Sequence, residues 1–287
     1  MRVRTAPGAA GRHMSSPAIS VVLSTYNQPD WLALALRGYA RQAWTDFEVL
    51  IADDGSGEAT RERIDALRPQ LPFAIEHVWH PDEGFRKCVI LNRALERARG
   101  DYVVFSDGDC VPRADFLAVH ARLRAPRRFL SGGYFKLPRA TSHAIGVEDI
   151  DSQRCFDLAW LRAHGLPRSH RDLKLGARGA GATLLDALSP ARASWNGHNA
   201  SGWRTDLVAA NGFDERMQYG GEDRELGERL ENAGVRGLRI RHRAIVLHLD
   251  HDRGYVRPEM IAANDRIRAE TRARRATRTG HGLIGAA

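Results

Sequence analysis

Residues 101–110 place two carboxylates, Asp107 and Asp109, one residue apart behind the apolar run 102–105. This run is rich in β-favouring residues and predicts a buried strand that opens into an acidic loop. In open α/β sheets, ligands bind beyond the carboxyl ends of the strands. Carboxylate oxygens at that position suit a hard divalent cation shared with substrate phosphates. The same residues also suit an Asx turn that binds no metal.

Two more pairs of acidic residues lie at the boundary of a predicted element. Asp53 and Asp54 end the apolar run 47–52, and Glu222 and Asp223 precede a helical segment over 224–232. Acidic residues in the first turn of a helix are stabilised by the helix dipole, so the second pair alone also fits a purely structural role.

The first half of the chain alternates between strand and helix patterns. Strands are predicted at 19–24, 47–52, 75–79 and 102–105, and helices at 31–42, 60–67 and 87–99. Such alternation indicates a parallel sheet with crossover helices. No GxGxxG or GxxxxGK[ST] loop is present, which argues against dinucleotide dehydrogenases and P-loop enzymes. Phosphates must then be neutralised in another way, for which a metal at Asp109 is the candidate.

The second half has a less regular pattern. We expect a helix at 115–124, a strand at 129–137, a helix at 224–232, a strand at 239–249 and a helix at 253–274. Residues 139–194 show no strong period and are expected to form loops and short helices around an acceptor pocket. The last residues, 277–287, are expected to be a frayed tail.

Composition excludes several classes of protein. The chain has 287 residues, 43% hydrophobic and 27% charged, as in soluble globular proteins. No apolar run approaches the ~20 residues of a membrane-spanning helix. Its three cysteines match no metal motif and favour reduced thiols in the cytoplasm. The net charge of +8 suits an anionic partner: nucleic acid, a membrane surface or a phosphorylated substrate.

Four motifs in order resemble those of the family 2-like glycosyltransferases. They are Ser24-Thr25-Tyr26-Asn27, Asp53-Asp54-Gly55-Ser56, Asp107-Gly108-Asp109 and Gly220-Gly221-Glu222-Asp223. The chain is most similar to bacterial chondroitin-polymerase-type enzymes and to the C-terminal motif of β-1,4-galactosyltransferases, over residues 19–252 apart from 139–194. The resemblance implies an α/β GT-A fold. It would be a single Rossmann-like nucleotide-binding domain with a mixed central sheet and an acceptor-binding C-terminal half.

The resemblance also implies how the donor is bound. Asp54 would contact the uracil base, Asp107 the ribose, and Asp109 would ligate Mn²⁺ or Mg²⁺ across the diphosphate. The nucleotide would also meet Thr25, Tyr26 and Asn27. Arg86 and Lys87 open the helix before the central strand and would add positive charge near the phosphates, or they are a solvated helix start.

Catalysis is assigned by the same resemblance to Glu222 and Asp223. Asp223 would take the proton of the acceptor hydroxyl as it attacks the anomeric carbon, and Glu222 would bind sugar or acceptor. Tyr219 lies where the galactosyltransferases carry a tryptophan, so an aromatic ring could still stack on a sugar.

His248 and His251 lie where the galactosyltransferases have a Met-x-x-His pair of metal ligands. Imidazole suits Mn²⁺ beside carboxylate and phosphate. We expect His251 as the first ligand and His248 as the second. Residues three apart on a regular strand face opposite sides, so both can bind only if the chain turns there. Upstream, Asn199 and Trp203 could contact the acceptor, or be a capped turn and a core tryptophan.

These inferences together predict a domain plan. Residues 1–17 would be a disordered leader and 253–287 a basic helical tail. The GT-A domain would span 18–252, divided into a nucleotide-binding half, 18–112, and an acceptor and catalytic half, 113–252.

The predicted function is metal-dependent, inverting transfer of a sugar from a UDP-sugar to a hydroxyl of a glycan or lipid-linked glycan. Bacterial surface polysaccharide or lipopolysaccharide assembly in the cytoplasm would fit. The arginines of 266–278 would contact anionic lipid at the inner face of the membrane, or form a solvated helix.

Two other functions compete with this one. The arginine excess would fit a non-enzymatic anion-binding or nucleic-acid-binding protein, but aromatics are not interleaved with basic residues on one face, so no nucleic acid is expected. A sugar-nucleotide pyrophosphorylase would need a glycine-rich basic loop after the first strand, where residues 25–29 instead read Thr-Tyr-Asn-Gln-Pro.

Overall fold

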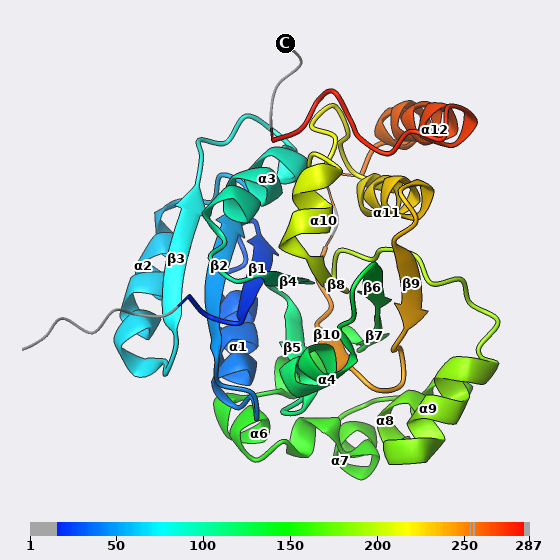
Figure 1. Cartoon of the computed structure of the whole chain (residues 1–287). Helices are drawn as coiled ribbons and strands as arrows, with labels where there is room; N and C mark the ends of the chain where they lie inside the picture. Colours follow the sequence, from blue (N-terminus) through cyan, green and yellow to red (C-terminus); the bar gives the residue numbers. More distant parts are fainter. Residues whose placement is uncertain (1–15, 253, 255, 284–287) are drawn as a thin grey trace, which may run out of the picture.

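The computed structural model describes residues 16–252, 254 and 256–283, arranged as two sheets covered by helices (Figure 1). The strands are β1 (Ile19–Thr25), β2 (Phe47–Asp53), β3 (Ala74–Trp79), β4 (Tyr102–Asp107), β5 (Cys110–Pro112), β6 (Arg128–Ser131), β7 (Gly133–Lys136), β8 (Asn199–Trp203), β9 (Arg236–Arg239) and β10 (Ile245–His248). The helices are α1 (Pro29–Ala40), α2 (Glu58–Leu67), α3 (Lys87–Arg97), α4 (Phe116–Leu123), α5 (Arg139–Ala144), α6 (Val147–Asp151), α7 (Leu158–Ala163), α8 (Leu173–Gly176), α9 (Gly179–Leu188), α10 (Arg204–Ala209), α11 (Glu222–Asn232) and α12 (Pro258–Ala273).

The larger sheet has seven strands in the order β3-β2-β1-β4-β8-β6-β9. Strands β1 to β4 run parallel to one another, as the alternating pattern predicted. Strand β8 is antiparallel to β4 and makes the sheet mixed. Thr25 pairs with Asp53, and Ser24 pairs with Asp107. The carboxyl ends of three parallel strands, two of them acidic, therefore lie at one edge of the sheet.

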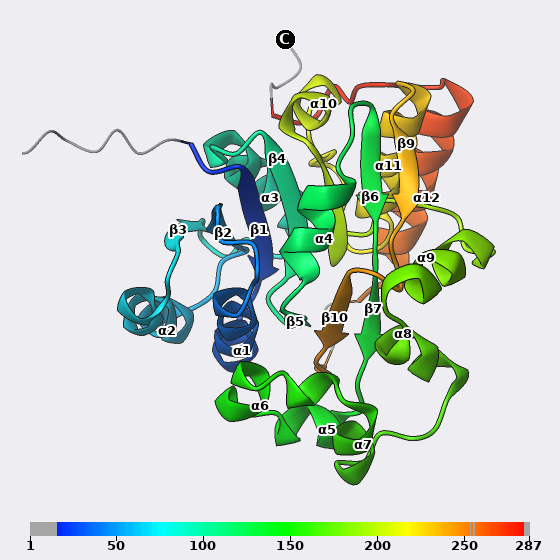
Figure 2. The ribbon, with the colours of Figure 1, turned by 60° about the horizontal axis from the view of Figure 1, so that its bottom comes forward.

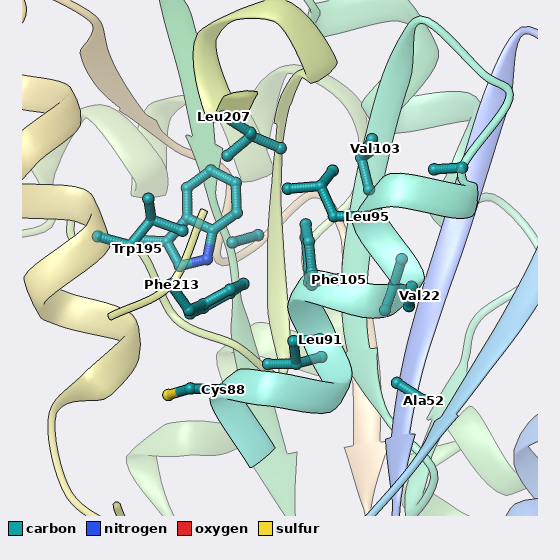
Figure 3. Packing of buried hydrophobic residues seen from close by; sticks show 14 of the residues in the cluster. Val22, Ala52, Cys88, Leu91, Leu95, Val103, Phe105, Trp195, Leu207 and Phe213 are labelled. Carbon is teal, nitrogen blue, oxygen red and sulfur yellow. The ribbon is translucent and has the colours of Figure 1, made fainter. Parts of the chain in front are cut away.

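Helices bury both faces of this sheet. Alternate residues of each central strand point to opposite faces, and β1 and β2 are almost entirely buried because both faces are covered. On one face, α1, α2 and α4 pack over Val21 and Leu23. On the other, Phe105, Trp195 and Phe213 pack edge to face under α3 and α10 (Figure 3).

Two segments predicted as single strands are each divided between the two sheets. The 129–137 strand becomes β6 and β7. Of the 239–249 strand, residues 245–248 form β10 and residue 239 is the last of β9, whereas 236–238 were not predicted as strand. The small sheet, β5-β10-β7, receives both crossings. Asn199 ties them together, because its buried amide donates to the carbonyls of Gly133 (2.9 Å) and Ala244 (3.1 Å). Gly132 permits this close approach, since a Cβ there would meet the Asn199 side chain at 2.1 Å.

Residues 139–194 form α5 to α9 and loops, as expected, and lie along the outer side of the small sheet (Figure 2). Their apolar side chains make a third core with β7 and β10, which includes Phe135, Ile150, Leu161 and Leu247.

The C-terminal segment is packed where the sequence predicted a frayed tail. Thr279 is buried and donates to Asp214 (2.7 Å), and Leu283 packs against the core and donates from its N–H to Asn211 O (3.2 Å). The expectation was therefore wrong for 277–283, because these residues find polar partners far away in sequence. Residues 284–287 of that prediction, and 1–15 of the predicted leader, lie outside the described residues. Within the described part of the chain, no helix has both the length and the apolar character needed to cross a membrane.

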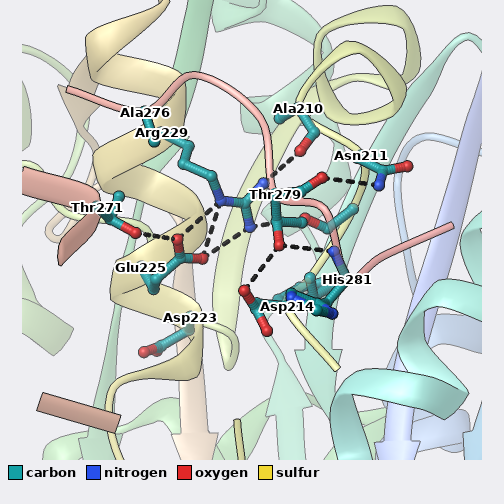
Figure 4. Close-up of polar contacts among 12 residues, drawn as sticks. Ala210, Asn211, Asp214, Asp223, Glu225, Arg229, Thr271, Ala276, Thr279 and His281 are labelled. Carbon is teal, nitrogen blue, oxygen red and sulfur yellow. Dashed lines mark hydrogen bonds and ion pairs between the residues drawn. The ribbon is translucent and has the colours of Figure 1, made fainter. Parts of the chain in front are cut away.

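A buried ion pair stabilises this region (Figure 4). The fully buried guanidinium of Arg229 binds the Glu225 carboxylate (2.7 Å) and donates to the carbonyls of Gly212 (2.8 Å) and Ala210. Replacing Arg229 by alanine should lower the free energy of unfolding by about 3–5 kcal/mol, because Glu225 is left charged and buried. Denaturant titration measures the loss.

Arg274→Ala is the matched control for this prediction. Arg274 pairs with Glu270 (2.9 Å), but 76% of its side chain is exposed, so its removal should change the free energy of unfolding by less than about 1 kcal/mol. Similar losses in the two variants would contradict the assignment of Arg229 as a core ion pair.

His120 gives the fold a pH dependence. It is fully buried between Ser201 (2.7 Å) and Asn199 (3.2 Å), and burial lowers the pKa of His120 to about 3. The unfolded chain takes up this proton near pH 6.5, so the unfolded state binds more protons between pH 6.5 and 3, and stability falls as pH is lowered through this window.

We expect His120→Gln to reduce this pH dependence. The slope of unfolding free energy against pH should differ from wild type by up to about 1.4 kcal/mol per pH unit, the value for one proton. Urea unfolding at several pH values between 4 and 7 measures it. Parallel slopes for the two proteins would show that His120 does not stay neutral.

Candidate active site

The edge where β1, β2 and β4 end borders a cavity of about 1020 Å³. Nearly all of the predicted site residues line it, although they are spread over six segments of the chain. They are Thr25, Tyr26, Asn27, Asp54, Lys87, Asp107, Asp109, Tyr219, Glu222, Asp223, His248 and His251. The amino end of α11 supplies the Glu222–Asp223 pair, and the end of β10 supplies the histidines.

Asp109, His248 and His251 form a cluster of one carboxylate and two imidazoles whose candidate ligand atoms all lie within 4.8 Å of one another. Asp109 Oδ2 lies 2.9 Å from His251 Nε2 and 3.6 Å from His248 Nε2. Strand β10 ends at His248, so the chain turns before His251, and this turn brings both rings to the same carboxylate. The condition for both histidines to bind one metal, a turn of the chain between them, is therefore met.

The cluster has the chemistry of a divalent cation site. Nδ1 of His251 donates to Asp252 O (2.9 Å), which leaves Nε2 directed at the Asp109 oxygen. When the His251 ring is neutral, both His251 Nε2 and Asp109 Oδ2 are acceptors. A proton or a metal cation between these two atoms would therefore stabilise their close approach. Fixing the ring through its second nitrogen is the usual arrangement around a histidine ligand. Mn²⁺ accepts this mixture of oxygen and imidazole donors.

Asp107 is held beside this cluster by two donors. Its Oδ1 accepts from Ser24 Oγ (2.6 Å) and from Lys87 Nζ (2.9 Å). Although burial alone would raise the pKa of Asp107, Lys87 and Ser24 lower it below its usual range. Burial alone would likewise lower the pKa of Lys87, but Asp107 and Glu222 raise it. The ammonium therefore stays charged among the cavity's carboxylates.

Asp54 lies at the end of β2 with its carboxylate bound from two sides. It accepts from His80 Nε2 (2.8 Å) and from the backbone N–H of Arg86 (3.0 Å). Burial raises the pKa of Asp54, although the hydrogen bonds from His80 and Arg86 act to lower it. The Arg86 side chain is absent from the described residues that line the cavity and instead pairs with Glu83. The charge predicted for Arg86 near the phosphates is therefore not placed there, and its contribution is the backbone N–H.

The loop after β1 is fixed by the loop after β2. Asn27 has a φ of 49°, and its backbone N–H donates to Ser56 Oγ (2.8 Å), while its side chain accepts from the N–H of Gly57 (3.0 Å). Tyr26 donates to Asp82 (2.8 Å) and remains 43% exposed at the mouth of the cavity. The aromatic ring is thus presented to a ligand by a rigid loop.

The Glu222–Asp223 pair begins α11 after a sharp turn. Gly220 and Gly221 have φ values of 111° and 89°, which side-chain-bearing residues rarely adopt. Asp223 Oδ2 accepts from Gly197 N (3.0 Å), and Glu222 accepts from Gly220 N (2.9 Å). Burial, and then the charge of Asp223, raise the pKa of Glu222, so this group keeps a proton to higher pH than an exposed glutamate. The two neighbouring carboxyls therefore differ in environment, as an acid–base pair requires.

The segment before β8 was missed as part of the site. Asn196, Gly197 and His198 line the cavity beside Tyr134. His198 Nε2 is buried with no hydrogen-bond partner among the described residues, and the ring packs edge-on to Tyr134 with centroids 4.6 Å apart. In the sequence, this segment is marked by Trp195-Asn196-Gly197-His198, an aromatic residue followed by polar and turn residues. From the sequence, the downstream residues Asn199 and Trp203 were the candidates instead.

Those downstream residues are structural. Asn199 is fully buried at the crossing of the two sheets, and Trp203 donates from its indole to Ala125 O (2.8 Å). Acceptor contact was one alternative for both residues, and a capped turn for Asn199 with a core tryptophan at 203 was the other. Trp203 packs as the second alternative predicted, whereas Asn199 joins the two sheets.

Two family models match the chain. Residues 20–123 match the model described as glycosyl transferase family 2, and residues 192–252 match the one described as the N-terminal domain of galactosyltransferase. The first contains Asp54, Asp107 and Asp109, and the second contains Glu222, Asp223 and both histidines.

Curated relatives match most of this chain. Validoxylamine A glucosyltransferase of Streptomyces hygroscopicus subsp. jinggangensis is 31% identical over 248 residues, 80% of this chain and 54% of that protein. Chondroitin synthase of Escherichia coli is 26% identical over 240 residues, 75% of this chain and 32% of that protein. The chain therefore spans about half the length of the first relative and a third of the second.

Solved structures share the fold. A mannosyltransferase from Pyrobaculum calidifontis, in complex with GDP-Man and Mn²⁺, superposes with a TM-score of 0.56 at 19% identity, covering 91% of this chain and 63% of that one. S. aureus TarS 1-349 in complex with UDP gives 0.57 at 18% identity, covering 90% and 68%.

Proposed function

Because this chain is a family 2-like glycosyltransferase with the GT-A fold, we propose that it transfers a sugar from a UDP-sugar to an acceptor hydroxyl with inversion, using a divalent metal. The observation that carries this proposal is the meeting of Asp109, His248 and His251 with the Glu222–Asp223 pair at one cavity. The family assignment favours a transferase over the non-enzymatic anion-binding or nucleic-acid-binding alternative.

The donor would occupy the β1–β4 side of the cavity. Asp54 would contact the base and Asp107 the ribose, and residues Thr25 to Asn27 would contact the nucleotide. Asp109, His251 and His248 would hold Mn²⁺ or Mg²⁺. When bound, this cation would neutralise the diphosphate and stabilise the nucleotide as leaving group. Lys87, tied to Asp107, adds fixed positive charge on the same side.

The acceptor would approach from the α11 side. Asp223, one of whose carboxylate oxygens accepts from the Gly197 N–H, would take the proton of the acceptor hydroxyl. Glu222, whose pKa is raised by burial, would hydrogen-bond sugar or acceptor hydroxyls. A base on the face opposite the leaving group gives direct displacement and inversion. Tyr219 also lines the cavity, and its ring would stack on a sugar.

The acceptor class is a hydroxylated glycan, either free or lipid-linked. Relatives are named for transfer to validoxylamine A and for synthesis of chondroitin and hyaluronan, so acceptors differ among them. A role in bacterial surface polysaccharide or lipopolysaccharide assembly at the cytoplasmic side of the membrane accords with the polysaccharide synthases among the relatives.

Contact of the basic tail with anionic lipid is a separate part of this proposal. Within 266–278, Arg268 and Arg272 both pair with Glu228, and Arg274 pairs with Glu270. Part of the charge is thus already matched within the protein. Sedimentation with anionic vesicles should fall when Arg275 and Arg278 are changed to glutamine. Equal sedimentation of the variant would exclude the tail as the contact.

A donor panel tests the proposed reaction. UDP-glucose, UDP-galactose, UDP-GlcNAc, UDP-GalNAc, UDP-glucuronate and GDP-mannose should be incubated with Mn²⁺, with and without a glycan acceptor, and nucleotide release measured. We expect release from a UDP-sugar, with a product of inverted anomeric configuration by NMR. Release from GDP-mannose alone, or a retained configuration, would overturn the corresponding part of the proposal.

A further inference from the structure

Helix α12 follows the part of the chain matched by the family models, yet it forms one wall of the cavity. Ile261, Asp265 and Arg268 line the cavity, although the matches end at residue 252. With Asn264, these residues lie at helical spacings of three and four and so form one face of α12. This face is directed at the turn that precedes Glu222 and Asp223.

Asn264 makes three hydrogen bonds to that turn. Its amide nitrogen donates to the carbonyls of Gln218 (2.8 Å) and Gly220 (3.1 Å), and its amide oxygen accepts from the N–H of Gln218 (3.2 Å). Asn264 is only 1% exposed, so water does not replace these bonds. A single side chain thereby fixes the backbone on both sides of Tyr219.

The same helix face packs directly on the glycines. A Cβ on Gly220 would lie 3.1 Å from Ile261 Cγ1, and one on Gly221 would lie 3.1 Å from Arg268 Cδ. Both glycines already have positive φ, so the turn is selected twice, by its backbone conformation and by the helix above it.

Separate contacts hold α12 in place. Arg268 pairs with Glu228 (2.7 Å), and Thr271 donates to Glu225 (2.7 Å), both on α11. Beyond the helix, Thr279 binds Asp214, and His281 O accepts from the N–H of Glu215 (2.7 Å) (Figure 4). Arg268 makes both kinds of contact, whereas Thr271 docks the helix on α11 and Asn264 binds the turn, so changes at these two positions separate docking from contact with the turn.

We propose that α12 is part of the active site and that Asn264 is a positioning residue, which holds the 218–221 turn so that Glu222 and Asp223 face the cavity. This proposal rests on the proposed function, in which those two carboxylates act on the acceptor. Placement of a reacting group within a fraction of an ångström is a large part of catalytic power.

The test compares Asn264→Ala with Thr271→Ala. Each variant removes one buried polar side chain of α12, but only Asn264 touches the turn. We expect Asn264→Ala to lower kcat by about tenfold or more while UDP affinity changes less than about threefold. Thr271→Ala should keep kcat within about twofold of wild type. Equal losses of kcat in the two variants, or no loss in Asn264→Ala, would overturn the proposal.

Hydrogen–deuterium exchange gives a readout that needs no turnover. Amides of 218–224 should exchange at least about tenfold faster in Asn264→Ala than in wild type or Thr271→Ala. Unchanged exchange there would refute the positioning role. If wild type turned over no sugar nucleotide, the proposed function would fail, and exchange would still decide the role of Asn264.

A milder variant guards against misfolding. Should Asn264→Ala not fold, Asn264→Asp keeps the oxygen that accepts from Gln218 and loses both donated bonds. The same increase in exchange around Gly220 is expected, and normal exchange in this variant would count against the proposal.

Discussion

Replacing Asp109 by alanine should lower kcat with the UDP-sugar donor by about a thousandfold or more, equivalent to roughly 4 kcal/mol of lost transition-state stabilisation. Asp109 is the carboxylate that both His248 and His251 face, at 3.6 and 2.9 Å, so its removal leaves the cluster with imidazoles alone. A nucleoside diphosphate leaving group then departs without its cation. Initial rates at saturating Mn²⁺ measure the loss.

The control for this prediction is Asp101→Ala. Asp101 precedes the same strand at its opposite end, is exposed, and is absent from the described residues that line the cavity. Its removal should leave the rate within about twofold, as is usual for exposed surface positions. A comparable loss in both variants would point to destabilisation of β4, and full activity of Asp109→Ala would refute the metal site.

Asp223→Asn should lower kcat by about a hundred- to ten-thousandfold, the usual contribution of a general base. Asparagine keeps an oxygen that can accept from the Gly197 N–H, now bound at 3.0 Å, so the start of α11 should be preserved. UDP affinity should stay within about threefold, because the change is made on the acceptor side. Calorimetric titration of UDP and steady-state kinetics separate the two effects.

Glu231→Gln provides a matched change on the same helix. Glu231 lies at the far end of α11 and pairs with Arg192 on the surface. This variant should retain wild-type kcat. If Asp223→Asn lost UDP affinity as strongly as it lost kcat, Asp223 would be a binding residue, and the base would have to be sought elsewhere.

The positions of the site carboxylates could be predicted from sequence because strand polarity is local information. Each apolar run ending in Asp53 or Asp107 specifies its own carboxyl end, and parallel pairing brings those ends to one edge. The alternation of strands and helices predicted the parallel part of the sheet for the same reason. The histidine pair was predicted from the family resemblance, on the condition that the chain turns between the two residues, and β10 ends at His248.

Long-range features were outside the reach of this reasoning. Runs 129–137 and 239–249 have apolar residues on both sides of each crossing, but the change from one sheet to the other is fixed by the distant side chain of Asn199. Asn264 is equally inconspicuous. It is a polar residue in an arginine-rich helix, and its two partner residues lie more than forty positions away. The tail beyond it appeared frayed because its contacts with Asn211 and Asp214 are not local.

Arg86 was assigned wrongly for a different reason, because its partner is local in sequence. Its charge and its place at a helix start suggested a phosphate contact, but Glu83, three residues earlier, binds the guanidinium. The Arg86 side chain is therefore held in a local ion pair. The neighbouring Lys87 pairs instead with Asp107, at the end of β4.

The central claim is that Asp109 and the two histidines form a metal site at which the donor diphosphate binds. Its most direct test is calorimetric titration of UDP into the wild-type protein with Mn²⁺ present and again after removal of metal by EDTA. The account predicts tight binding with Mn²⁺ and at least about a hundredfold weaker binding without it, equivalent to about 2.7 kcal/mol. Equal affinity for UDP under the two conditions would contradict it.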